Sequence, residues 1–342
     1  MKMMKHLACG AFAVALAAGI SGCGSKEQTY AGPKVAEGTI AAIAARLPEN
    51  TSLSSLCKQY GLSVADLMKK ISDKDAQEII KELELDKAQT KWLAVNISEV
   101  SAAKIEKGEP DFAVAIATTV DLDKAIAAGD KKKEFKKTTI AGVPAYEAGD
   151  SDKKSRGFMA NLDKQLILVA NSSAGLEKQI ALYREGKGES KDFGAFALGA
   201  NDILRVKLAK VGENVKKALP DPDMLKMVNQ MIPDGDKIVQ GLGTLELALG
   251  ATGDGKEIKL DLSVDTAADA DADKLVTFAK TGIMALTAQM KEGAAKDADA
   301  KMAYEALQAI KIENKGKTAT LSAATAADPA LKAIADKVKD IK

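Results

Sequence analysis

Histidine is nearly absent from this sequence: its one copy among 342 residues is His6. Histidine is the side chain that most often serves as a general acid or base and as a metal ligand, and it activates serine and cysteine nucleophiles. After residue 6, such chemistry would depend on carboxylates, lysine or a thiol alone. We therefore expect a protein that is not an enzyme and holds no metal or other cofactor.

Aromatic residues are also scarce, at 4% of the chain, and neither sign of charge dominates. The 49 Lys and Arg residues are dispersed and face 48 Asp and Glu residues. Nucleic-acid binding requires a concentrated basic surface, so we expect no nucleic-acid partner. The short basic runs at 131–133 and 136–137 favour a solvated loop or helix face.

The first 22 residues have the pattern of a secretory signal peptide. Lys2 and Lys5 give a basic start, and the uncharged run 7–20 is rich in Ala and Gly. This run is shorter than the ~20 apolar residues that a membrane-spanning helix needs. We therefore expect residues 1–22 to be removed on export.

The next four residues identify the kind of signal. Ile20, Ser21, Gly22 and Cys23 resemble the lipobox of bacterial lipoproteins, in which an aliphatic residue and two small residues precede a cysteine. The resemblance implies cleavage before Cys23, a diacylglyceryl group on its sulfur and usually a third acyl chain on its amino group. Two or more acyl chains hold a protein stably on a bilayer, so the expected partner is a membrane. The Asp that tends to retain members of this family in the inner membrane is missing after Cys23, which favours the outer membrane, facing the periplasm or the cell surface.

The remaining cysteines leave one free thiol. Cys9 departs with the signal peptide and Cys23 is acylated, so Cys57 remains alone and no intramolecular disulfide can form. Cys57 lies in a helical pattern and is interpreted as a small buried hydrophobe.

Hydrophobic periodicity predicts an α+β fold of two tandem units, each an antiparallel sheet with helices packed on one face. The first unit opens with a helical region to about residue 87. The clearest strand signal is an alternating run at 245–249 answered at 258–264 across Asp254-Gly255, a typical hairpin pattern. Other strands are expected at 92–97, 112–116, 138–146, 157–162, 165–170 and 193–198. Helices are expected at 122–128, 174–184, 202–219, 223–232, 273–290, 300–309 and from 328 onward. The predicted divisions are a signal peptide at 1–22, a lipidated tether at 23–38, a first unit at 39–186 and a second unit at 187–342.

Three motifs have a structural interpretation that we prefer to a catalytic or metal-binding one. Ser101–Lys104 and Lys280–Gly282 match penicillin-binding-protein motifs, but the second interrupts a predicted helix where that family has a strand. Asp269, Asp271 and Asp273 have calcium-loop spacing without the required Gly and Glu, and suit the first turn of a helix.

Two further features bear on binding. Residues 52–67 resemble the two-helix middle of a LysM peptidoglycan-binding module, although the pattern that follows predicts more helix where that module has a strand. Met224, Met227 and Met231 share one helix stripe, for which core packing and an adaptable binding face remain open.

These observations predict a membrane-anchored, non-catalytic envelope lipoprotein that binds or scaffolds an envelope protein or peptidoglycan. The alternative is a carrier that holds a lipid or other amphiphile in an apolar cavity between sheet and helices.

Overall fold

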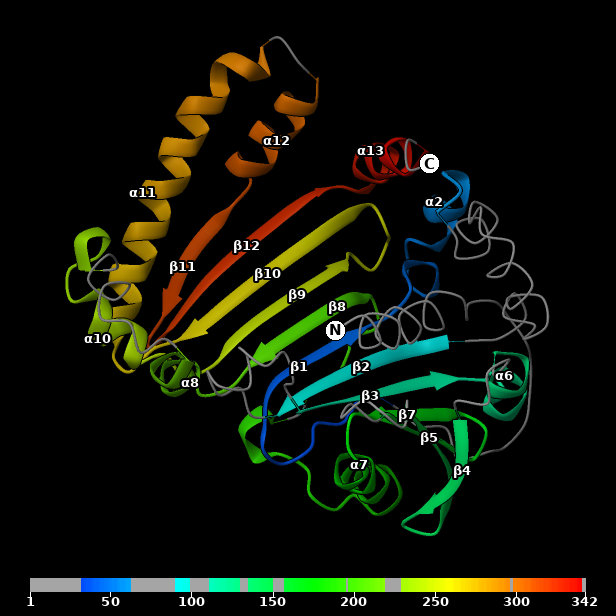
Figure 1. Ribbon diagram of the computed structural model, residues 1–342. Coiled ribbons are helices and arrows are strands. Elements are labelled where there is room, and N and C mark those ends of the chain that lie inside the picture. Colours follow the sequence, from blue (N-terminus) through cyan, green and yellow to red (C-terminus); the bar gives the residue numbers. More distant parts are fainter. Residues whose placement is uncertain are drawn as a thin grey trace.

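One continuous sheet dominates the structure. The computed structural model describes residues 32–62, 90–98, 111–129, 135–149, 157–194, 196–218, 229–295 and 298–339. Within them, twelve antiparallel strands are ordered β11-β12-β10-β9-β8-β1-β2-β3-β7-β6-β5-β4 (Figure 1). The strands are β1 (Thr39–Ala45), β2 (Thr90–Ser98), β3 (Asp111–Thr118), β4 (Phe135–Ile140), β5 (Val143–Ala148), β6 (Gly157–Leu162), β7 (Leu166–Ala170), β8 (Asp202–Leu208), β9 (Leu245–Ala251), β10 (Glu257–Asp265), β11 (Lys311–Lys315) and β12 (Thr318–Ala326).

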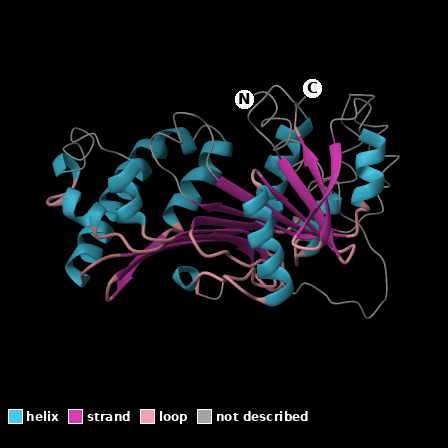
Figure 2. Ribbon diagram, turned by 60° about the horizontal axis from the view of Figure 1, so that its bottom comes forward, coloured by secondary structure: helices cyan, strands magenta, loops and turns pink. Residues whose placement is uncertain are grey.

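Helices lie on both sides of this sheet (Figure 2). The helices are η1 (Pro48–Asn50), α2 (Ser54–Gln59), α6 (Leu122–Gly129), α7 (Ser173–Glu185), η2 (Lys191–Phe193), α8 (Val211–Ala218), α10 (Gly235–Gln240), α11 (Asp269–Ala294), α12 (Ala298–Gln308) and α13 (Ala327–Lys339). The mixed helix-and-strand fold with an antiparallel sheet confirms the coarse prediction.

The prediction of two tandem units is wrong, because the sheet is single. β1 pairs with β2 on one side and with β8 on the other, so that Ile43 lies opposite both Val95 and Val206. Without β1, each half would present an unpaired strand edge. The first strand of the chain therefore joins the two halves by satisfying both edges.

The sequence analysis missed β1 and placed a helix over β8. Thr39–Ala45 is rich in alanine, a strong helix former, and 202–219 carries apolar residues at helical spacing. In the structure Ala42 and Ala44 are fully buried within the sheet, and the 202–219 segment divides into β8 and α8. Pairing with distant strands overrides local propensity at both places.

The hairpins follow their turn chemistry. The predicted β9–β10 hairpin is confirmed, with Leu249 opposite Leu260 and Gly255 at a φ of 69°. The single strand expected at 138–146 is wrong, because β4 and β5 are separated by a turn. Ala141 and Gly142 have φ values of 48° and 72°, as a tight two-residue hairpin turn requires.

Both faces of the sheet are covered in its first half, from β2 to β7. One face presents alanines such as Ala94 and Ala115, which let α7 pack closely through Leu176 and Ile180. The other face packs against α6 in a cluster that contains Val114, Ile116, Ile167, Val169, Leu122 and Ile126. The prediction of helices on one face only is therefore wrong for this half.

Candidate functional site

The second half of the sheet has one apolar and one polar face. Strand alternation and antiparallel register align the apolar side chains in rows across five strands; the middle row runs Ile43, Val206, Leu247, Leu262, Leu321. We call this surface the leucine face, which consists of Ile43, Leu204, Val206, Leu208, Leu245, Leu247, Leu249, Leu260, Leu262, Val264 and Leu321. Small residues flank it on its two outer strands, at Ala41 and Ala45 and at Ala319 and Ala323.

Every side chain of the leucine face is half-buried, and none belongs to a fully buried cluster of the described residues. The same face in the first half of the sheet is buried: Ile116 is 1% exposed and Ile167 is 3% exposed. Burying an aliphatic side chain fully contributes about 1.5–3 kcal/mol. Each side chain of the leucine face can therefore gain a part of this energy from a further apolar contact.

Described helices stand along the borders of the leucine face. On the outer side, α11 and α12 pack on β11 and β12, where Ile312 is buried and Asn314 donates to Asp273 at 2.6 Å. At one strand end, α2 and α13 pack together through Leu53 and Leu331. Figure 1 shows β8, β9, β10 and β12 with these helices at their ends and at the β11 edge. Between these helices, no described element buries the side chains of the leucine face fully.

The opposite face of the same strands is suited to water. Arg205 contacts Asp202 at 2.9 Å and Glu246 at 2.6 Å, and Lys207 lies 3.5 Å from Glu246. Lys207 also donates to the carbonyl of Phe193 at 2.8 Å. This ion-pair network lies on the opposite face from the leucine face. The two faces of these strands therefore differ in chemistry: one carries charged side chains and the other only aliphatic ones.

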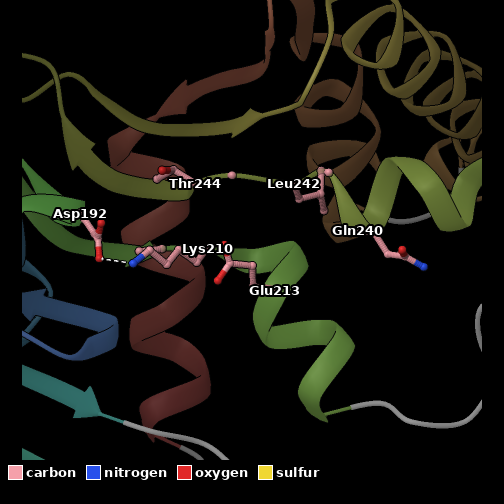
Figure 3. A pocket seen from close by; sticks show the side chains of 9 residues that line it. Asp192, Lys210, Glu213, Gln240, Leu242 and Thr244 are labelled. Atoms are coloured by element: carbon pink, nitrogen blue, oxygen red, sulfur yellow. Dashed lines mark ion pairs between the residues drawn. The ribbon is translucent and has the colours of Figure 1, made fainter.

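A separate polar pocket of about 340 Å³ lies at the ends of β8 and β9. Lys210 contacts Asp192 there at 2.8 Å, with Glu213 and Gln240 nearby (Figure 3). Its lining residue Ala209 belongs to the core under α7, on the other side of the sheet from Leu208. The pocket is therefore distinct from the leucine face.

The pocket offers little chemistry. Its hydrogen bond to Asp192 raises the pKa of Lys210, so the amine stays protonated and is neither a base nor a nucleophile. The first amides of α8 are also occupied, because Val211 and Gly212 donate to the carbonyls of Gly243 and Leu242, each at 2.8 Å. An anion would find no free amide from these two residues.

Several of the residues singled out from the sequence fall outside the described part of the chain. These are Ile20, Ser21, Gly22, Cys23, Ser101, Lys104, Met224 and Met227. Met231 is described and is 58% exposed, so it does not pack in the core. Residues 52–62 of the LysM-like stretch include α2, and the rest lies outside the description.

The other predicted residues have structural roles. Cys57 is buried beneath α13 as a free thiol, and burial, with the nearby charge of Glu49, raises its pKa to about 11. Asp269 and Asp271 form the first turn of α11, as expected, and 280–282 lies inside the same helix. Among the described residues there is no group of three or more acidic, Cys or His side chains that could hold a metal.

Sequence reasoning did not identify the leucine face as a site. Its strand alternation was visible at 245–249 and 258–264, and it predicted one buried face. Nothing in that pattern indicates whether another element covers the face, and the segment that supplies Leu204, Val206 and Leu208 was assigned to a helix.

No described helix is both long enough and apolar enough to cross a membrane. No protein-family model matches the chain, and no curated protein matches it either. Among solved structures, the chain is similar to TP0453 in its crystal form I, with a TM-score of 0.37 and 12% sequence identity, over 91% of this chain and 98% of the other.

Proposed function

We propose that the protein is a membrane-anchored, non-catalytic envelope lipoprotein whose leucine face binds an apolar or amphiphilic ligand. The observation that carries the proposal is the half-burial of eleven aliphatic side chains on a sheet whose other half is covered on both faces. Contiguous apolar surfaces that are not fully buried often mark binding sites.

Two further points support a binding function. The polar pocket holds the Lys210 amine in an ion pair with Asp192, so this lysine is not available there as a base or nucleophile. The lipobox at Ile20–Cys23 favours a location beside a membrane, where amphiphiles are abundant. Of the two functions expected from the sequence, we therefore prefer the carrier of a lipid or other amphiphile over the scaffold.

The test compares two neighbouring substitutions on opposite faces of β10. Leu262 belongs to the leucine face and Ser263 to the polar face, and both are half-buried. The protein is the mature chain carrying Cys23→Ser, and the probe is the apolar dye N-phenyl-1-naphthylamine, followed by fluorescence. Leu262→Asn should weaken dye binding at least tenfold, because it places an amide where apolar contact is needed.

Ser263→Asn is the matched control and should change the dye affinity by less than twofold. Both variants should unfold within a few degrees of the parent, because neither residue belongs to a buried cluster. Equal effects of the two substitutions, or no dye binding by the parent, would contradict the proposal.

A further inference from the structure

We propose that the occupant of the leucine face is the hydrocarbon of a membrane lipid, with part of each acyl chain lying along the strands. This inference rests on the proposed function and names the ligand class for the same surface.

The dimensions of the face set the size of the ligand. Five strands about 4.8 Å apart span roughly 19 Å, and the four residue steps from Leu260 to Val264 at about 3.4 Å span roughly 14 Å. The resulting area of roughly 270 Å² is a third of the ~800 Å² that each partner gives to a standard protein–protein interface. The leucine face is therefore too small for a stable contact with a second copy of this chain or with another folded protein.

The chemistry of the face sets the kind of ligand. All eleven members are aliphatic, with no hydroxyl, amide, aromatic or charged group among them. Protein–protein contacts carry about one hydrogen bond per 100–200 Å² and rely on Trp, Tyr and Arg. A surface that offers neither suits a ligand with no hydrogen-bonding groups in the contact, which is the property of an acyl chain.

The length of the face predicts a limit on chain length. A carbon–carbon bond of about 1.5 Å advances an extended chain by about 1.25 Å per carbon, so roughly 14 Å accommodates about 11 carbons. Each methylene that lies on the face should tighten binding by at most about fourfold. Methylenes beyond the eleventh extend past the face and should add little.

The experiment measures displacement of N-phenyl-1-naphthylamine from the Cys23→Ser protein by lysophosphatidylcholines with chains of 4 to 20 carbons, below their micelle concentrations. We expect affinity to rise steeply up to about 11 carbons and then to level off. Fatty acids of the same lengths should give the same break, because the head group lies outside the contact. Affinity that rises without a break, or that does not depend on chain length, would overturn the inference while leaving a general apolar site in place.

A second variant shortens the face itself. Val264 ends the apolar run of β10, so Val264→Asn removes one two-residue step of about 7 Å and should move the break from about 11 to about 6 carbons. Leu245→Asn, at the paired position on β9, should do the same and serves if the first variant does not fold. An unchanged break in a folded variant would overturn the placement of the chains along the strands. Failure of both dye and lipids to bind would instead reject the proposed function.

Discussion

The reactivity of Cys57 depends on the groups that the fold packs around it. Cys57 is 1% exposed, within a small cluster formed by α2 and α13, and Tyr60 beside it donates to Asp328 at 2.5 Å. Glu49 adds a negative charge nearby. Burial and this charge both disfavour the thiolate, so a residue that is reactive elsewhere acts here as a packing group.

The raised pKa of Cys57 predicts a loss of stability at alkaline pH. Between the ordinary thiol pKa of 9.0 and the folded value of about 11, the unfolded chain has released the proton that the folded chain retains. Stability must then fall as pH rises, by at most about 1.4 kcal/mol per pH unit from this group. Urea unfolding of the Cys23→Ser protein from pH 8 to 10.5 should show this slope.

Cys57→Ala in the same background is the control, because it removes the thiol and leaves every other ionisable group in place. The difference in unfolding free energy between the two proteins should shrink as pH rises. Parallel pH profiles would contradict the assignment.

The two edge strands of the sheet carry charged residues that oppose pairing with another chain. The outermost strands β4 and β11 carry exposed lysines, among them Lys136 and Lys137, which the sequence analysis placed on a loop or helix. Charged edge strands discourage pairing with another chain. The leucine face lies on interior strands, so its exposure does not also expose backbone edges.

The start of α7 offers a test at this scale. Ser172 precedes the helix in an extended conformation, and its side chain accepts a hydrogen bond from the Gly175 amide at 3.0 Å. Ser172→Ala should lower the free energy of unfolding by about 1 kcal/mol, because one helix amide loses its partner. Chemical denaturation should show no comparable loss for the control Ser173→Ala, at an exposed position in the first turn. Equal losses would mean that the cap does not contribute.

At the scale of the whole molecule, one sheet has two environments. The half from β2 to β7 is covered on both faces, whereas in the half from β8 to β12 the described residues leave the leucine face only half-buried. β1 connects them and lies next to the start of the described chain. There Val35 is 2% exposed and accepts a hydrogen bond from the Ser190 amide at 2.8 Å. The described chain is therefore packed into the fold from about Val35 onward, shortly after the predicted anchor at Cys23.

The anchor itself is tested on the full-length chain in a bacterial host. Cys23→Ser should abolish palmitate labelling and release the protein from membranes washed with carbonate, because the acceptor sulfur for the acyl group is gone. Cys57→Ser is the matched control and should stay labelled and membrane-bound. Persistent labelling of the Cys23→Ser protein would contradict the lipobox assignment.

Local chemistry allowed much of the element content to be predicted. The Asp254-Gly255 turn, the helix from Ser173 to Glu185 and the acidic first turn of α11 all follow from short-range preferences that act within a few residues. Composition alone also excluded histidine chemistry after residue 6, and the lipobox predicts the anchor.

Only the tertiary structure decided the position of β1 and the exposure of the leucine face. A strand pattern shows that the two faces of a strand differ in polarity. The element that buries one of them can lie far away in the sequence, where local patterns do not reveal it. Ile43 meets Val206 across 163 positions of sequence, and the local preference for helix at both segments gave no sign of that pairing. The candidate site therefore depends on long-range packing, which covers one half of the sheet and leaves the other accessible.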